Sequence, residues 1–505
     1  MTAALDTFGA SIGLSPREIQ TLASAHQPPK RDSGNSSQSI SQACAAAQLA
    51  IGEANVDTAP VNETLAAENW SQACVFQPYC IVQPATTDDV SKVLKIIKYY
   101  GIQFSVRSGG HSPNPGWSNT QNGFLVDLQK LNQIALSTDG AVASVGPGAR
   151  WGDVIAYLDQ HEAAVVGGRI PAVGVGGLML GGGLWHFSGA FGTAADNVKT
   201  FEVVLADGTI THASQTENSD LFWALKGGGP NFGVVTRYDL NTVPARNIWY
   251  QVAVYSVDQA PAILDAFAEW QTSGAADVKS TVAMIFNLDS ILLGFLYAEP
   301  SDQQPEAFTS FDSLPEPLMY ALPATNGTVA SLTDFLGSAF TAEPLRHDYR
   351  ACSTRVDAGL YKDTYSFWRE RALQVRETTG ANQTFTIQPI SKNFAQQGLE
   401  KGGNPMGIPL EDHQWWTTLV DWENAEDDEL VRSVSIDTTA EMQKLASERG
   451  LDLPFRFMND ASRDQNPLAS YGEENVAKLK TIAQKYDADQ LFQRQTDGFL
   501  LSKVC

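Results

Sequence analysis

His111 stands at the tip of a glycine-rich turn, in segment 106–112, whose sequence is Val-Arg-Ser-Gly-Gly-His-Ser. The residues before it, Ile102, Phe104 and Val106, alternate with polar residues as in a half-buried strand. Two glycines let the backbone turn sharply and approach a ligand closely. Successive main-chain N–H groups in such a turn bind anions, for example a pyrophosphate. A histidine beside a turn is also an ordinary surface feature, so a second signal is needed.

The second signal is segment 167–183, in which eight of seventeen residues are glycine. The segment is too apolar for a flexible linker, which would be rich in serine and charge. It does not fit the dinucleotide fingerprint, because Met179 stands where the third glycine would be. It is not a P-loop, since no Gly-Lys-Ser/Thr follows. The pattern therefore predicts a backbone that lies directly against a ligand, in neither of the two familiar nucleotide-binding modes.

Three further segments extend this region. Residues 192–198 contain Asp196-Asn197-Val198, and the alternating run that begins at Phe201 ends in Asp207-Gly208, which predicts a tight hairpin. Residues 220–236 contain another triple glycine followed by Pro-Asn-Phe-Gly. With these segments in place, the chain resembles the vanillyl-alcohol-oxidase or PCMH-type flavoproteins, and within them the berberine-bridge-enzyme-like oxidases of fungi. The resemblance covers roughly residues 70–245 and 455–495.

The resemblance implies that FAD is the cofactor and that His111 is bonded covalently to the flavin 8α-methyl group. It places the pyrophosphate on the first loop and the second glycine segment on the other side of the cofactor. The C-terminal stretch 455–492 then returns to the FAD domain. The cofactor-binding residues implied are His111, Arg107, Ser108, Gly109, Gly110, Ser112, Val173, Gly174, Gly176, Gly177, Gly181, Asn197, Val235, Asn459 and Asn475.

One position departs from the family pattern. Many members carry a cysteine in the second glycine segment that bonds to flavin C6, and alignment through Pro171 puts Ile170 there. The resemblance therefore implies a single attachment, through His111 only. Val173 occupies a position where a small residue is thought to leave a path for oxygen, which favours an oxidase over a dehydrogenase. A valine in an apolar run is equally compatible with core packing.

The elements that must position these segments indicate an α+β fold. Residues 87–100 have helical spacing between two strands, which leads the chain into the loop of His111. We expect an N-terminal arm (1–40) ending in a polar stretch at 27–37, and a PCMH-type FAD-binding domain of two α+β subdomains (41–245). A substrate domain (246–450) follows, with a mainly antiparallel sheet covered by helices. Strands are expected near 251–257, 280–297, 384–390 and 415–422, with a helix at 425–449, and segment 451–505 returns to the FAD domain.

The catalytic base is not identified by the sequence. Position 460 is usually tyrosine in similar sequences, whereas this chain has Asp460; an exposed loop residue is the favoured interpretation, and a general base close to the flavin is the alternative. Tyr349, Tyr361 and Tyr365 are further candidates, each also compatible with a structural role. His186, which follows the triple glycine, is another catalytic candidate; it is expected to shape the floor under the flavin ring or to pack. Core packing is the favoured interpretation of Trp415, Trp416 and Trp422.

Composition limits the possible partners. The chain has 505 residues, of which 43% are hydrophobic and 18% charged, enough for two or three domain-sized cores. Its net charge of −23 argues against nucleic acid and against an anionic membrane surface. No apolar stretch reaches the length of a transmembrane helix, and no metal-ligand motif is present. The expected partners are a small-molecule substrate and O2, without a metal; the oligomeric state is left open.

The five cysteines leave at least one unpaired. The resemblance to similar fungal sequences favours a disulfide between Cys44 and Cys80, which would suit an oxidising compartment. The first fourteen residues lack the basic start and the continuous apolar region of a signal peptide. Two locations stay open: cytoplasmic if Met1 is the native start, and secretory if a signal was removed.

Three functions are compatible with the sequence. The leading one is an FAD-dependent oxidase of a small, secondary-metabolite-like substrate, in which hydride passes to flavin N5 and oxygen reoxidises the flavin to give hydrogen peroxide, with or without ring closure. The second is a carbohydrate oxidase, which is disfavoured because similar sugar oxidases usually carry the cysteinyl link that Ile170 lacks. The third is a redox-silent flavoprotein whose FAD supports only binding or a non-redox cyclisation.

Overall fold

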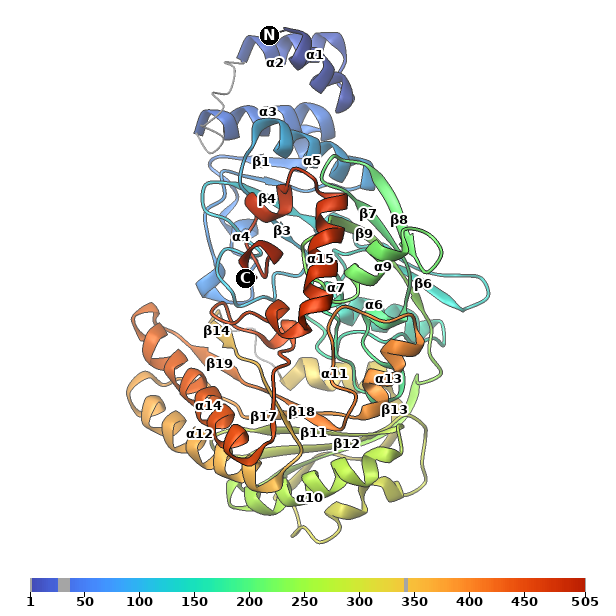
Figure 1. Ribbon diagram of the computed structural model, residues 1–505, viewed down its shortest axis with the longest axis vertical. Helices are drawn as coiled ribbons and strands as arrows, with labels where there is room; N and C mark the ends of the chain where they lie inside the picture. The colour runs from blue at the N-terminus through green and yellow to red at the C-terminus, as the bar shows by residue number, and fades with distance from the viewer. Residues whose placement is uncertain (1, 26–36, 340–343, 505) are drawn as a thin grey trace.

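The chain folds into two regions that differ in their sheets and helices, and its C-terminal segment contributes to both (Figure 1). This computed structural model describes residues 2–25, 37–339 and 344–504. Two smaller sheets occupy the region nearer the N-terminus, and a large antiparallel sheet with three long helices occupies the opposite end. The fold is α+β, as predicted. The expected polar stretch 27–37 lies, apart from Ser37, outside the described residues.

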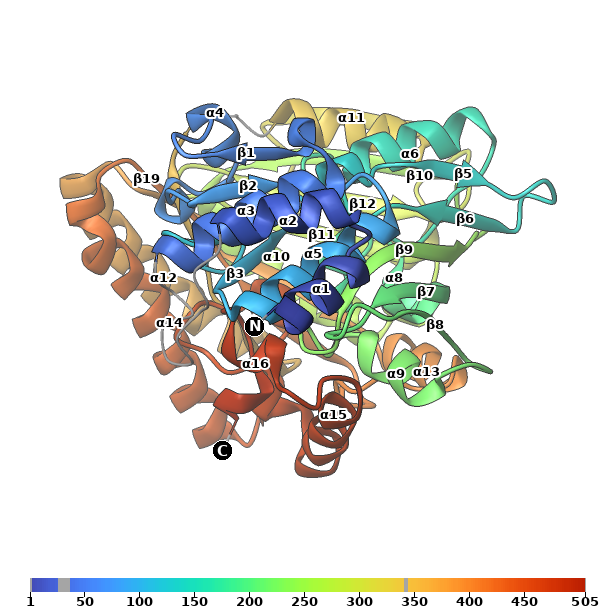
Figure 2. The ribbon, with the colours of Figure 1, turned by 90° about the horizontal axis from the view of Figure 1, so that it is seen from above.

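Residues 2–25 form two docked helices, α1 (Thr2–Ser11) and α2 (Pro16–Ala25). Their apolar side chains share a core with α3 (Ser37–Ile51) and α5 (Thr87–Tyr100), and the rings of Phe8 and Tyr99 stack 3.8 Å apart. Figure 2 shows α1, α2 and α3 layered over this end of the molecule. The predicted disulfide between Cys44 and Cys80 is confirmed, and it ties α3 to the first sheet.

The first sheet delivers the His111 loop. Its strands lie in the order β1 (Val56–Thr58), β2 (Cys80–Val82), β4 (Phe124–Asp127) and β3 (Phe104–Arg107), and β2, β4 and β3 are parallel. Helix α5 connects β2 to β3 over the predicted residues, because a capping box between Thr86 and Asp89 starts it and Gly101, at φ 64°, ends it. The loop of His111 leaves the end of β3.

The second sheet lies next to the second glycine segment. Its antiparallel strands lie in the order β5 (Ile134–Leu136), β6 (Val142–Val145), β9 (Val234–Asn241), β7 (Val198–Val204) and β8 (Ile210–Ser214). The predicted hairpin joins β7 to β8, and Gly208 adopts φ 83° in its turn. The helices of this region are α4 (Glu63–Ala66), α6 (Trp151–Gln160), α7 (Val175–Leu180), α8 (Ser188–Phe191) and α9 (Ser219–Leu225).

The large sheet consists of two four-stranded parts that meet at Phe286 and Phe385, whose backbones exchange two hydrogen bonds. One part is β11 (Ser280–Phe286), β12 (Ile291–Tyr297), β10 (Asn247–Tyr255) and β13 (Met319–Thr328). The other is β17 (Thr386–Ile390), β18 (His413–Thr417), β15 (Cys352–Arg355) and β20 (Asp452–Leu453). A three-stranded sheet, β14 (Arg346–Tyr349), β19 (Leu419–Trp422) and β16 (Asn382–Gln383), lies beside them.

Helices α10 (Ala260–Thr272), α12 (Ala358–Thr379) and α14 (Asp428–Arg449) pack on one face of this sheet (Figure 1). Tyr361 and Tyr365 of α12 are buried in that helix-side core with Trp416 and Trp422. Trp415 lies in the core on the other side, stacked on Phe457. The packing expected of the tryptophans is observed, and the two tyrosines share the core instead of facing the other side of the sheet.

The remaining helices join the two regions. They are α11 (Val329–Ala339), α13 (Lys392–Glu400), α15 (Glu473–Tyr486) and α16 (Leu491–Arg494). Helix α15 lies beside α9, so the last part of the chain packs against the first region (Figure 1). Among the described residues, no helix combines the length and apolarity needed to cross a membrane.

Candidate active site

The two glycine-rich segments lie against one another, backbone to backbone. A Cβ on Gly109 would collide with the main chain of Gly174, and a Cβ on Gly174 would collide with Gly109. The Ser108 hydroxyl joins the segments, since it donates to the carbonyl of Pro147 at 2.5 Å and accepts from the Gly176 N–H at 3.0 Å. The Arg150 guanidinium donates to the carbonyls of Gly109 and Ala172. Only glycine permits this approach, which explains the glycine content of both segments.

Arg107 lies beneath the loop and is fully buried. Its Nη2 lies 2.8 Å from Oδ2 of the equally buried Asp127 and also donates to the carbonyl of Leu65 at 2.8 Å. Nη1 lies 3.4 Å from Oδ1 of Asn69. Both terminal nitrogens of the guanidinium are therefore engaged by the protein, while Nε is buried without a hydrogen-bond partner among the described residues, and Arg107 is suited to hold the loop in place.

Replacing Arg107 with methionine is expected to lower the free energy of unfolding by about 3–5 kcal/mol, because it leaves the Asp127 carboxylate buried without its partner. Urea denaturation followed by circular dichroism measures the change. The Arg107→Met/Asp127→Leu double variant is the matched control, and it should recover much of the loss. Equal instability of the single and double variants would show that the ion pair is not the cause.

The first loop offers free donors to an anion. Within the described residues, the backbone N–H groups of residues 109–112 make no hydrogen bond to the protein. Gly177 faces open space, since no atom lies within 4 Å of the position that its Cβ would take. Four unpaired N–H groups beside a close glycine surface match what a phosphate-bearing cofactor requires. The residues present therefore fit FAD.

His111 is held in an aromatic stack. Its ring lies 4.2 Å from Trp70, and the other face of Trp70 stacks on His347 at 3.7 Å. The hydroxyl of Tyr349 lies 3.4 Å from His111 Nδ1. Burial, followed by the charges of Arg150 and His347, lowers the pKa of His111 to about 3. The imidazole is consequently neutral at physiological pH, so that a ring nitrogen keeps a lone pair for bond formation.

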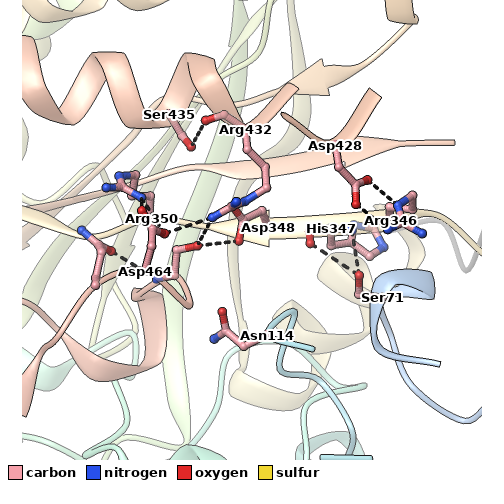
Figure 3. Close-up of polar contacts among 12 residues, drawn as sticks. Ser71, Asn114, Arg346, His347, Asp348, Arg350, Asp428, Arg432, Ser435 and Asp464 are labelled. Carbon is pink, nitrogen blue, oxygen red and sulfur yellow. Dashed lines mark hydrogen bonds and ion pairs between the residues drawn. The ribbon is translucent and has the colours of Figure 1, made fainter. Parts of the chain in front are cut away.

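Strand β14 connects this stack to a charged network, because its side chains alternate. His347 stacks on Trp70, and Tyr349 contacts His111. Arg346 and Asp348 instead face helix α14 (Figure 3). Arg346 pairs with Asp428 at 2.6 Å, and Asp348 pairs with Arg432 at 2.7 Å.

The same network holds the loop that follows Asp460. Asp348 accepts from Ser462 at 2.8 Å, and Asp464 pairs with Arg350 and Arg432. The Asn114 amide donates to the carbonyl of Ala461 at 3.2 Å. The C-terminal loop is thus fixed to β14, to α14 and to the end of the His111 loop.

Asp460 is half-buried, so the expectation of an exposed loop residue is wrong. Its Oδ2 accepts from Nε2 of Gln388 at 2.6 Å, and Oε1 of Gln388 accepts from Nη2 of Arg169 at 2.7 Å. Burial raises the pKa of Asp460 to about 6, although Arg169 and Gln388 act in the opposite direction. A carboxyl of this pKa exchanges protons near physiological pH.

His186 and Tyr349 complete this group. Burial and the charge of Arg169 lower the pKa of His186 to about 3, and its Nε2 is buried without a hydrogen-bond partner among the described residues. Burial, with the charge of Asp460, raises the pKa of Tyr349 above the usual value, so its phenol stays protonated. We call Arg169, His186, Tyr349, Gln388 and Asp460 the Asp460 cluster.

The other predicted site residues have more varied surroundings. Asn459 packs on Gly181 and donates to the carbonyl of Leu178 at 3.0 Å, which places it at the second glycine segment. The side chain of Asn197 donates hydrogen bonds to the carbonyls of Phe191 and Thr193 and accepts one from Lys401.

Asn475 donates to the carbonyl of Tyr471, Val235 is buried in β9, and Val173 and Ile170 are half-buried. Tyr365 belongs to the helix-side core rather than to the Asp460 cluster.

Sequence reasoning missed Trp70, Arg150, Arg169, His347 and Gln388. The sequence did contain a signal for Arg169, because it is the only charged residue in the second glycine segment. The others carry no motif, and the fold alone brings them together. Among the described residues, no group of three or more His, Cys, Asp or Glu side chains could hold a metal ion.

Comparisons with known proteins agree with this geometry. The FAD binding domain family matches residues 78–214. An FAD-dependent monooxygenase of Arthrobotrys oligospora is 40% identical over 86% of this chain and 84% of its own. The bifunctional solanapyrone synthase of Alternaria solani is 33% identical over 83% of this chain and 81% of its own.

Solved structures share the fold at lower identity. The xylooligosaccharide oxidase of Myceliophthora thermophila superposes with a TM-score of 0.76 at 22% identity, covering 91% of this chain and 98% of that one. The glucooligosaccharide oxidase of Acremonium strictum gives 0.75 at 19% identity, covering 90% and 97%. Fold and site together define an FAD-linked oxidoreductase. The chain belongs to the family of fungal FAD-dependent monooxygenases that its sequence relatives represent, and it shares its fold with a berberine-bridge-enzyme-like protein of Physcomitrella patens.

Proposed function

We propose that this protein is an FAD-dependent oxidase of a small, secondary-metabolite-like molecule, with Asp460 as its catalytic base. The observation that carries the proposal is the contact between the two sites: the Tyr349 hydroxyl lies 3.4 Å from Nδ1 of His111, and Asn114, at the end of the His111 loop, donates at 3.2 Å to the carbonyl of Ala461, which follows Asp460. A cofactor attached at His111 would thus lie next to a carboxyl that is able to take a proton.

The proposed division of the chain is an arm (1–40), an FAD-binding domain (41–245), a substrate domain (246–450) and a returning segment (451–505). FAD would be held by the free N–H groups of Gly109, Gly110, His111 and Ser112, by the surface of Gly174, Gly176, Gly177 and Gly181, and by Asn459. We assign the covalent attachment to His111 alone, because Ile170 replaces the cysteine of doubly linked relatives. Val173 is proposed to leave oxygen a path to the flavin.

In the proposed reaction, side chains of the Asp460 cluster would take up the proton that the substrate loses. Asp460 accepts a proton from the substrate hydroxyl, and Gln388 holds the carboxylate through its 2.6 Å hydrogen bond. Tyr349, which stays protonated, donates to a substrate oxygen. When bound, FAD supplies the hydride acceptor and passes the electrons to oxygen, which yields hydrogen peroxide.

Two alternatives differ in substrate or in the fate of oxygen. Carbohydrate oxidases share the fold, but at identities under 25%, and the solved glucooligosaccharide oxidase is described as having a 6-S-cysteinyl linkage that this chain lacks at Ile170. Sequence relatives are named monooxygenases, which would place an oxygen atom in the product.

Oxygen stoichiometry separates these possibilities. With candidate metabolites and oligosaccharides offered to the purified holoenzyme, we expect flavin reduction under nitrogen by a non-sugar substrate, followed on aeration by one hydrogen peroxide per oxygen consumed. Oxygen uptake without peroxide would replace the oxidase by a monooxygenase. Reduction by oligosaccharides alone would favour the carbohydrate oxidase, and a flavin that no candidate reduces would favour the redox-silent role.

A further inference from the structure

Two members of the Asp460 cluster, Arg169 and His186, have no part in the proton transfer proposed above. Arg169 comes from the second glycine segment and is half-buried. Among the described residues it makes one hydrogen bond, from Nη2 to Gln388, so its Nε and Nη1 donors remain available. His186 is 8% exposed, and its Nε2 has no partner. Buried polar groups are normally paired, so the unpaired Nε2 of His186, together with the free donors of the half-buried Arg169, indicates a ligand at this site.

In the Asp460 cluster, a side chain that can only donate hydrogen bonds, Arg169, stands beside one that, when ionised, can only accept them, Asp460. A guanidinium has only donors, whereas an ionised carboxylate has only acceptors. Gln388 bridges them, with Nε2 on Asp460 and Oε1 on Arg169, and so fixes their separation. The complementary ligand carries a hydroxyl that donates to Asp460 and a carbonyl that accepts from Arg169.

Charge balance narrows the ligand further. When Asp460 takes a proton, its negative charge disappears and Arg169 loses the anion that compensates it. A half-buried guanidinium without a counter-charge is unfavourable. When the proton leaves before the hydride, the negative charge that remains on the substrate compensates Arg169 best if it spreads to the oxygen that faces Arg169, which favours a hydroxyl conjugated with a carbonyl.

We propose that the substrate presents a conjugated hydroxy-carbonyl group, the enol of a 1,3-dicarbonyl, to Arg169 and Asp460, with His186 as a further hydrogen-bond partner. This rests on the proposed oxidase function and names its substrate class. The O–H bond breaks and its proton goes to Asp460, while a C–H bond of the conjugated substrate breaks and its electron pair leaves as hydride to FAD. The product is the dehydrogenated dicarbonyl compound, which has lost one proton and one hydride, that is, two hydrogens and two electrons.

The charge on Asp460 agrees with this class. A carboxyl with a pKa near 6 readily takes a proton from an acidic enol, whereas an ordinary sugar hydroxyl is far less acidic. The remaining ionisable neighbours in the cluster do not compete, because His186 is neutral and Tyr349 stays protonated.

The test uses two small probes that differ in the group of interest: 1,3-cyclohexanedione, which is a vinylogous acid, and cyclohexanone, which lacks the enol. Binding to the holoenzyme is measured by isothermal titration calorimetry and by the change in flavin absorbance. We expect the dione to bind more tightly than the ketone, and Arg169→Met to weaken dione binding by about tenfold or more without affecting the ketone. The dione affinity of Arg169→Lys should lie between those of the wild type and Arg169→Met, because lysine keeps the positive charge but lacks the planar guanidinium that donates two parallel hydrogen bonds.

Arg17→Met is the matched control, because Arg17 is exposed on α2 and far along the chain from the cluster. Equal affinity of wild type and Arg169→Met for the dione, equal affinity for the two probes, or no dione binding up to its solubility limit would each overturn the proposal. Failure of the oxidase function would show separately, as a flavin that no substrate reduces, because calorimetric binding of the dione requires no turnover. The covalent flavin of Arg169→Met verifies that the variant is folded.

Discussion

Replacing His111 with alanine is expected to abolish acid-stable attachment of the flavin. In wild-type protein denatured with acid, the yellow colour should stay with the polypeptide. In His111→Ala it should pass entirely into the supernatant, because Ile170 offers no second point of attachment. Absorbance of the two fractions and the mass of the intact chain both measure the result.

The physical basis is the state of the imidazole. Burial and the neighbouring charges keep His111 neutral, and Trp70 and Tyr349 fix its ring. His161→Ala, at an exposed histidine, is the matched control and should retain the colour. Colour released from the wild type would refute a covalent bond, whereas colour retained by His111→Ala would move the bond to another residue.

The sequence predicted a close approach of backbone at both glycine-rich segments, because only glycine fits such an approach. Gly109 and Gly174 lie far apart in the sequence, and in the structure their backbones touch each other. Helix α5 was predicted to the residue from its apolar spacing, and the structure adds the capping box and the terminal glycine that set its ends. Arg107 shows the limit: its place in the motif suggested contact with the cofactor, but its side chain is buried with Asp127.

The Asp460 cluster could not be assembled from the sequence. Its five members come from five separate segments, and only the packing of β14 and β17 near the second glycine segment unites them. Asp460 was expected on an exposed loop, yet the ion pairs of Asp348 and Asp464 with Arg432 fix that loop to β14 and α14, and Asp460 is half-buried. Tyr365, a base candidate that was also compatible with a structural role, lies in the helix-side core, and no local signal in the sequence separates a tyrosine of the core from one of the site.

Replacing Asp460 with asparagine is expected to lower the rate of flavin reduction by roughly 10²–10⁴-fold, the usual contribution of a general base. Asparagine keeps the size and the hydrogen bond to Gln388 but takes no proton. Stopped-flow absorbance under nitrogen measures the rate directly, and the acid-stable flavin content should be unchanged, because His111 does not depend on Asp460 for its neutral state.

The pH profile gives the decisive signature. A base acts only when ionised, so the wild-type rate should fall as pH decreases through about 6, where Asp460 becomes protonated. The neighbours do not mask this titration, since His186 has lost its proton well below that range and Tyr349 keeps its proton well above it. In Asp460→Asn the acid limb should disappear along with most of the rate.

Tyr349→Phe is the comparison that separates a base from a nearby donor. It removes a hydroxyl at the same site but leaves the Asp460 carboxylate, so the rate should fall while the acid limb near pH 6 persists. If Asp460→Asn retained both the rate and the limb, and Tyr349→Phe lost them, the phenol would have to be the proton acceptor. That outcome requires a much lower phenol pKa than its burial beside Asp460 produces, which is why the carboxyl is the assigned base.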